Sequence, residues 1–180
     1  MPESFNFLPV LEGASITIRP ATAADFEPLY SAASDPEIWT LHPDPERYKR
    51  DVFERNFFAP AIAGTGALVV VDRETQSLIG SSRFYEWNSA AEEICIGYTF
   101  LARSHWGGDY NREMKGLMLQ HAFQFSRRVW IHIGIDNFRS RKAMEKIGGK
   151  LSHTEFRNQG GRQVENCYYF IDRDDPGVFK

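Results

Sequence analysis

The chain is poor in cysteine and carries no surplus of positive charge. Its two cysteines, Cys95 and Cys167, lie far apart in apolar surroundings. We therefore expect buried free thiols rather than a disulfide, as is usual in a reducing compartment. Lysine and arginine number 21 against 24 aspartates and glutamates, mixed along the chain, which gives a net charge of −3. This balance argues against a nucleic-acid-binding surface and against a basic face that binds membranes.

Several motifs are also missing, and each absence excludes a class of site. The chain has no Gly-Lys-Ser or Gly-Lys-Thr, which excludes a P-loop, and no Gly-x-Gly-x-x-Gly after the first expected strand, which argues against a Rossmann site. It has neither His-x-x-x-His nor Cys-x-x-Cys spacing, so we predict no metal. No apolar run is long enough to span a bilayer. The opening MPESFNFLPVLEG lacks the basic-then-apolar order of a secretory signal, so we expect a cytoplasmic protein.

Hydrophobic patterning predicts the elements of one domain over residues 1–180, since no repeat or linker interrupts the chain. Alternating or β-branched runs indicate strands, and apolar residues spaced three or four apart indicate helices. The expected strands cover residues 15–21, 66–72, 77–87, 92–101 and 127–135, with a hairpin over 150–172, and the expected helices cover residues 22–34, 43–63, 110–125 and 137–147.

The order of these elements predicts the topology of the sheet. Short turns join the strands between residues 66 and 101, which is typical of an antiparallel meander. A helix separates the strand over 92–101 from the strand over 127–135, so these two should be parallel, with a right-handed crossover. We predict an α+β fold in which an antiparallel meander joins a parallel pair, with helices on both faces.

The segment SHWGGDYNREMK, residues 104–115, places two glycines directly before the most periodic helix. A helix N-terminus has unpaired N–H groups and partial positive charge, and glycine lets a ligand approach the backbone. Together these features suit a phosphate or pyrophosphate. The alternative is that Gly107 and Gly108 only serve the turn between strand and helix.

Three stretches resemble the GCN5-related N-acetyltransferase (GNAT) family, particularly the branch similar to ribosomal-protein N-acetyltransferases. They are LEGASITIRP (11–20), IGYTFLARSHWGGDYNREMK (96–115) and DNFRSRKAMEKIGG (136–149). The resemblance extends over about residues 10–172, which would form the core of the domain. It implies a mixed sheet whose parallel pair splays apart, and acetyl-CoA as co-substrate with its pantetheine arm in the gap.

The resemblance also implies which residues bind the cofactor. The backbone near Thr99, Phe100 and Leu101 would hold the arm. Asn137 and Ser140 would face the far side of the cofactor. The loop and first helical turn would hold the pyrophosphate, through Trp106, Gly107, Gly108, Asp109, Tyr110 and Asn111. Asp109 stands where the family usually has glycine. Its carboxylate would repel a phosphate unless the side chain points outward. The alternative role is at the start of the helix, where a carboxylate interacts favourably with the helix dipole.

The catalytic groups depart from the family pattern. Cys95 stands where relatives often carry a glutamate, and Met144 where many carry a tyrosine that donates a proton. Glu93 lies two residues before Cys95 on the same strand face, and we expect it to assist deprotonation of the amine through water. The alternative is an exposed carboxylate at the end of a strand. Tyr98 is our candidate proton donor, with Ser81, Tyr85 and Tyr110 left open.

Cys95 and His132 could form a nucleophilic pair, but we favour a core thiol and a hydrogen-bonded histidine. Arg83 and Glu86 could orient a charged substrate. Aromatic residues on the side where relatives take their acceptor either line that cleft or fill the core; they are Trp39, His42, Phe57, Phe58, Tyr85 and Trp87.

The sequence thus predicts an N-acetyltransferase that acetylates a primary amine, either a protein N-terminus or a small molecule. The alternative is a non-catalytic module that binds CoA for sensing or regulation. An enzyme that modifies antibiotics or polyamines would differ only in its acceptor. The oligomeric state is open, with a homodimer as one option.

Overall fold

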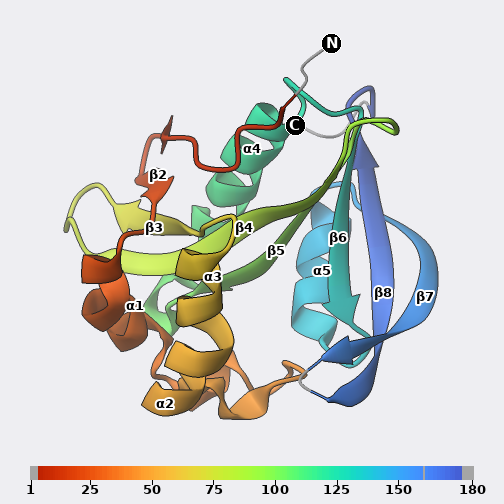
Figure 1. Cartoon of the computed structure of the whole chain (residues 1–180). Helices are drawn as coiled ribbons and strands as arrows, with labels where there is room; N and C mark the ends of the chain where they lie inside the picture. Colours follow the sequence, from red (N-terminus) through yellow and green to blue (C-terminus); the bar gives the residue numbers. More distant parts are fainter. Residues whose placement is uncertain (1–3, 160, 176–180) are drawn as a thin grey trace.

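The computed structural model describes residues 4–159 and 161–175, whose strands form one eight-stranded mixed sheet with helices on both faces (Figure 1). The strands are β1 (Leu11–Glu12), β2 (Ile16–Pro20), β3 (Leu68–Asp72), β4 (Leu78–Asn88), β5 (Glu93–Leu101), β6 (Arg128–Gly134), β7 (Lys150–Gln159) and β8 (Arg162–Asp172). The α-helices are α1 (Phe26–Ala33), α2 (Arg50–Phe53), α3 (Ala59–Ala63), α4 (Tyr110–Ala122) and α5 (Phe138–Lys146). Short 3₁₀ turns cover Ala23–Asp25, Pro36–Ile38, Pro45–Tyr48 and Arg103–His105, and a π-helical turn covers Glu54–Phe58.

The strand order across the sheet is β1-β2-β3-β4-β5-β6-β8-β7. Strands β1 to β5 pair antiparallel in chain order, β5 pairs parallel with β6, and β8 lies antiparallel between β6 and β7. The predicted α+β fold, with a meander joined to a parallel pair, is therefore confirmed.

The parallel pair is short. β5 and β6 are in register only at Glu93 with Arg128, Ile94 with Val129 and Cys95 with Trp130. Beyond these residues β5 stays paired with β4 and β6 stays paired with β8, so the two strands diverge. In Figure 1 their ribbons meet at one end and separate toward the other.

Two buried clusters hold the helices against the sheet. On one face, Met114 and Met118 of α4 pack with Ile94 and Ile96 of β5, and the same cluster includes Met144 of α5. On the other face, α1 and the 50–63 segment bury a cluster that includes Leu29, Phe53, Phe57 and Phe100. Because side chains alternate along a strand, Glu93 and Cys95 point away from α4.

The helix expected over 43–63 is instead broken into pieces. Pro45 begins a 3₁₀ turn, and the π-helical turn precedes Pro60, which has no N–H to donate to an earlier carbonyl. The expected helix over 110–125 ends earlier, at Ala122, whose carbonyl accepts a hydrogen bond of 2.9 Å from the Ser126 hydroxyl.

The other local predictions agree more closely with the structure. Both cysteines are free and buried. Gly148 follows α5 with a φ of +93°, the left-handed conformation expected after a helix. In the described part of the chain, no helix combines the length and the apolar character needed to cross a membrane.

Candidate active site

A cleft opens where β5 and β6 diverge. It holds about 500 Å³ and is lined by both strands, the loop before α4, the first turns of α4 and α5, and the segment around Trp39. Thr99, Phe100 and Leu101 of β5 all line it, as the resemblance implied. The edge of β5 that faces β6 has no strand partner beyond Cys95, so its backbone groups can hydrogen-bond an extended ligand that contains amides.

The glycine loop forms one end of the cleft. Gly107 lines the cleft with a φ of +76°, and a Cβ placed there would meet no atom within 4 Å. A side chain would therefore enter open space beside the backbone, in a conformation that L residues rarely adopt. Trp106 is fixed beside it by a 2.9 Å hydrogen bond from its indole N–H to the Leu101 carbonyl, and Asn111 in the first turn of α4 also lines the cleft.

The N-terminus of α5 faces the cleft from the opposite wall. Asn137 caps this helix, since its side-chain oxygen accepts a hydrogen bond of 3.2 Å from the Ser140 N–H, and both residues line the cleft. Arg139, one residue earlier than Ser140, places its guanidinium carbon 4.0 Å from the centre of the Trp106 ring. This stacking joins the α5 wall to the glycine loop.

The charges of the cleft favour an anion. The residues described as lining it include no aspartate or glutamate, but they do include Lys115 and Arg139. Asp109 does not line the cleft; its backbone carbonyl accepts the Glu113 N–H at 2.8 Å. An electropositive cleft with a glycine loop at one end and an unpaired strand edge along its side fits the charge and the amides of coenzyme A.

A β-bulge at Tyr98 shapes the wall formed by β5. Ser81 of β4 is paired with Phe100 and Arg83 with Gly97, so β5 has one residue more than β4 over this stretch. Tyr98 takes a φ of +52°, and the Arg83 guanidinium carbon lies 4.3 Å from the centre of its ring. The bulge resets the alternation of β5, so that Thr99 faces α4 while Phe100 faces the opposite cluster.

A second hollow lies on the face of the sheet that α4 does not cover. It is lined by Glu86, Trp87, Asn88, Ser89, Glu93, Cys95, Trp130, His132, His153 and Tyr168. The Glu93 carboxylate lies here and accepts a hydrogen bond of 2.9 Å from the Trp130 indole. His132 lines both the hollow and the cleft, so the two spaces adjoin at this side chain.

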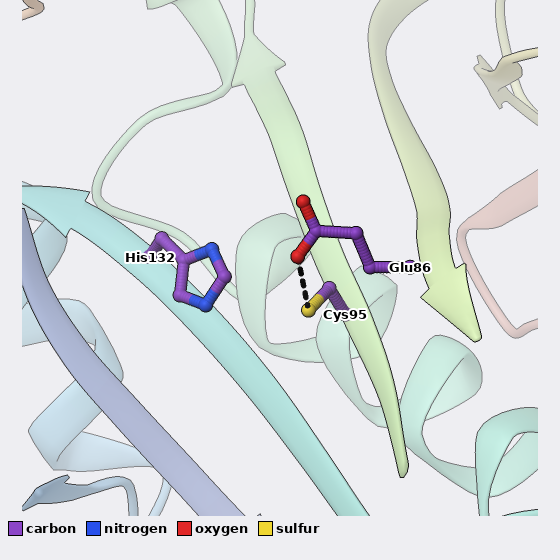
Figure 2. A group of neighbouring side chains, drawn as sticks. All are labelled: Glu86, Cys95 and His132. Atoms are coloured by element: carbon purple, nitrogen blue, oxygen red, sulfur yellow. Dashed lines mark hydrogen bonds between the residues drawn. The ribbon is translucent and has the colours of Figure 1, made fainter. Parts of the chain in front are cut away.

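Glu86, Cys95 and His132 point toward one another from β4, β5 and β6 (Figure 2). The Cys95 thiol donates to the Glu86 carboxylate across 3.6 Å. Burial, followed by the effect of Glu86, raises the pKa of this thiol well above its usual range. A protonated, buried thiol is a poor nucleophile, which favours the interpretation of Cys95 as a core residue.

These three side chains form, within residues 4–159 and 161–175, a group whose potential ligand atoms all lie within 4.8 Å of one another. Sequence spacing could not show this, because three different strands supply the residues. Arg157 pairs with Glu86 at 2.6 Å and also contacts Nδ1 of His132, to which the Tyr85 hydroxyl lies at 3.1 Å.

Because arginine can only donate, the Arg157 contact makes Nδ1 of His132 an acceptor and puts the ring proton on Nε2. Burial, with the Arg157 charge, also lowers the pKa of His132 to about 4, so the ring is neutral at pH 7. A cation on this group would have to displace or face the guanidinium of Arg157. The expectation that no metal binds stays a prediction.

Of the remaining predicted residues, Tyr98 lines the cleft and the others lie outside it. Gly108, Asp109 and Tyr110 do not line it, and the Tyr110 hydroxyl instead donates to Asp72 at 3.1 Å. Glu93 and Tyr98 are not brought together in one space, since Glu93 lies in the hollow and Tyr98 in the cleft. Their roles in binding and catalysis stay predictions.

The structure also places Arg83 and the aromatic residues that were expected either to line the acceptor cleft or to fill the core. Arg83 is buried between the rings of Phe57 and Tyr98. Of the aromatic residues, Trp39, Phe57 and Phe58 are core residues; Trp39 and His42 also line the cleft, and Trp87 lines the hollow.

The lysine and the arginine of the cleft, Lys115 and Arg139, were among the lining residues missed from the sequence. Lys115 follows Asn111 by four residues and so lies on the same face of the predicted helix. This spacing was the available signal for Lys115. Arg139 lies between Asn137 and Ser140, in the helical turn already implicated, but nothing in the sequence indicates its stacking on Trp106.

Comparisons with known proteins agree with this geometry. Residues 15–150 match the model of the acetyltransferase (GNAT) domain. No curated protein sequence matches the chain. Among solved structures, the chain is similar to a GCN5-related N-acetyltransferase from Brucella melitensis, with a TM-score of 0.84 and 18% identity over 99% of this chain and 87% of that one.

Two structures from Vibrio cholerae share the fold. One is spermidine N-acetyltransferase in complex with CoA and spermine, with a TM-score of 0.69 and 16% identity over 93% of this chain and 100% of that one. The other is a protein assigned as a ribosomal-protein-serine acetyltransferase, with a TM-score of 0.73 and 14% identity over 91% of this chain and 97% of that one. Because the matched domain covers most of the chain, the protein belongs to the GNAT acetyltransferase family and is an acetyltransferase that uses acetyl-CoA.

Proposed function

We propose that the protein transfers the acetyl group of acetyl-CoA to a primary amine that enters from the hollow. The observation that carries this proposal is the position of His132, which lines both the cleft between β5 and β6 and the hollow on the other face. A cofactor held in the cleft and an amine held in the hollow would therefore meet where the two strands begin to diverge.

The residues of the cleft would hold the cofactor in an extended conformation. Acetyl-CoA supplies an activated thioester, and the chain supplies the groups that position it. The unpaired edge of β5 at Thr99 to Leu101 would bind the amides of the pantetheine arm. The glycine loop and the first turn of α4 would bind the pyrophosphate, and Asn137 and Ser140 would contact its far side.

The hollow has the chemistry expected for a cationic amine. It presents the carboxylates of Glu86 and Glu93, and the ring systems of Trp87, Trp130 and Tyr168. Carboxylates attract an ammonium group, and aromatic faces bind it through cation–π interactions. Both a peptide N-terminus and a small polyamine carry such a group. We propose an amine acceptor of one of these two kinds.

Glu93 is our proposed base. Its carboxylate lies in the hollow, where it would take the proton from the incoming ammonium through a water molecule. Tyr98 is our proposed donor of a proton to the leaving thiol, because it lines the cleft on the bulge of β5. We place the reaction in the cytoplasm, where two buried free cysteines would stay reduced. A homodimer stays a prediction.

The test is a turnover assay that measures release of free thiol from acetyl-CoA. Peptides with free N-termini and linear polyamines are offered as acceptors. We expect turnover with one class, and Glu93→Gln should flatten the pH dependence of kcat while leaving the dissociation constant of acetyl-CoA unchanged. Glu92→Gln, which changes a neighbouring carboxylate outside the hollow, is the matched control. No turnover with any amine, or a Glu93→Gln profile identical to the wild type, would contradict the respective proposals.

A further inference from the structure

Lys115 is a buried cation without an anionic partner in the described part of the chain. It lies on α4, is only 9% exposed, and lines the cleft. Its ammonium makes one hydrogen bond, of 3.0 Å, to the neutral hydroxyl of Thr99. That hydroxyl also lies 2.8 Å from the Ser82 hydroxyl, so its hydrogen-bonding capacity is shared. Two of the three ammonium protons of Lys115 thus have no acceptor among the described residues.

An arrangement of this kind is unfavourable without a ligand. Moving an ammonium group out of water carries a large free-energy penalty, which is normally offset by a carboxylate nearby. Burial alone lowers the pKa of Lys115 to about 8, and among residues 4–159 and 161–175 no carboxylate opposes the shift. A methionine of similar length would fill the same volume without this penalty. Burial of a lysine at this position therefore favours a role in binding an anion over a role in packing.

The geometry indicates which end of a ligand the ammonium would meet. Lys115 stands one helical turn after Asn111, and side chains of a helix lean toward its N-terminus. The ammonium contacts Thr99, near the end of β5 that leads into the glycine loop. On the opposite wall, the guanidinium of Arg139 lies on Trp106 beside the same loop. Both cations thus line the cleft, and Arg139 adjoins the loop before the N-terminus of α4, which also favours negative charge.

We propose that Lys115 binds the pyrophosphate of acetyl-CoA and is a charge-recognition residue of this enzyme. This inference rests on the proposed placement of the cofactor in the cleft. Lys115 would supply positive charge to the pyrophosphate from α4, in addition to the N–H groups of the loop.

The test measures binding and not only activity. Acetyl-CoA and S-acetylpantetheine, which has the thioester but no phosphate, are titrated by calorimetry into the wild type, Lys115→Met and Lys142→Met. Lys142 is an exposed lysine of α5 outside the cleft, and its variant controls for the loss of one positive charge. We expect Lys115→Met to weaken acetyl-CoA binding about ten- to a hundredfold, the range for one lost hydrogen bond to a charged group. Binding of S-acetylpantetheine should stay the same.

Proton uptake gives a second readout that a structural role would not change. A bound phosphate would raise the pKa of Lys115 again from about 8, so binding of acetyl-CoA at about pH 8 should take up about half a proton. Titrations in buffers of different ionisation enthalpy measure this number. The other titratable or charged groups of the cleft are His42, Tyr98, His105, His132 and Arg139. Lys115→Met retains all of them, so only the uptake that is lost in this variant belongs to Lys115.

Three outcomes would overturn the inference. Equal acetyl-CoA affinity in the wild type and Lys115→Met would show that the ammonium does not contact the cofactor. An equal loss for acetyl-CoA and S-acetylpantetheine would place Lys115 at the pantetheine arm or the thioester instead of the pyrophosphate. Unchanged proton uptake in Lys115→Met would assign the titration to another group. Failure of the wild type to bind acetyl-CoA would instead contradict the proposed function itself. A urea titration of the ligand-free variant, expected to be at least as stable as the wild type, excludes misfolding.

Discussion

Replacing Gly107 with valine should separate the role of the glycine loop in binding from its role in folding. Gly107 has a φ of +76°, a conformation that costs an L residue about 1–2 kcal/mol, with a larger penalty for a β-branched one. A Cβ at this position would meet no atom within 4 Å, so no clash adds to this cost. We therefore expect Gly107→Val to fold, with a modest loss of stability.

The effect on binding should be larger. The valine side chain would occupy the open space beside the loop backbone, which we propose for the pyrophosphate. If it prevents one or two hydrogen bonds to a charged oxygen, each contributing about 1.5–3 kcal/mol, the dissociation constant of acetyl-CoA should rise at least about tenfold. Calorimetric titration of both proteins with acetyl-CoA measures this change.

The matched control is Gly148→Val. Gly148 has a similar φ of +93° and also has open space around its Cβ position, but it does not line the cleft. This variant should lose a comparable amount of stability in urea and bind acetyl-CoA like the wild type. Equal affinities in Gly107→Val and the wild type would refute the argument and leave the two glycines as parts of a turn. Equal losses of affinity in both variants would show that strain, and not the cradle, controls binding.

Two further predictions concern stability. The Arg19 guanidinium holds the pKa of the buried Asp25 carboxyl at about 2, so ionised Asp25 stabilises the fold above pH ~4, and this contribution is lost as the pH falls toward 2. Asp25→Asn should therefore lower the free energy of unfolding by about 1–3 kcal/mol at pH 7. Urea titrations should show that this difference from the wild type disappears between pH ~4 and ~2. A difference that stays constant over this pH range would contradict the role given to ionised Asp25. Phe57 is fully buried, with its ring centre 4.9 Å from that of Phe53, so Phe57→Ala should cost about 3–5 kcal/mol. Phe156→Ala, at a side chain that is 63% exposed, should change stability by less than about 0.5 kcal/mol, and similar urea midpoints for the two variants would refute this account of the core.

The elements of the fold were predictable because their signals are local. The β-branched run of β3, the apolar stripe of α4 and the glycine after α5 each depend on residues within a few positions of one another. The parallel pairing of β5 and β6 followed from the length of the connection between them. The glycine loop could be assigned to the site because it precedes the start of a helix, whereas the place of Asn137 followed from the family resemblance.

The parts that the sequence did not show depend on contacts between distant residues. Tyr98 bulges out of β5, and no composition rule predicts where an extra residue interrupts a strand. His132 meets Tyr85 and Arg157, which lie 47 and 25 residues away. Lys115 is the single lysine of α4 and looks in sequence like a solvent-exposed helix residue, and only the strands packed over α4 make it buried. Burial of a single cation is a property of the assembled sheet.

The short ladder between β5 and β6 has a consequence for the lifetime of the protein. Three residue pairs join the meander of β1 to β5 to the strands β6 to β8, which is the shortest ladder between any two neighbouring strands from β2 to β8. Local opening of a protein concentrates where few contacts hold two parts together, and proteases attack such openings. A cofactor that lies in the cleft would touch both halves and tie them together, stabilising the closed form by mass action. The supply of acetyl-CoA in the surroundings would then set not only how fast this enzyme works but also how long it survives.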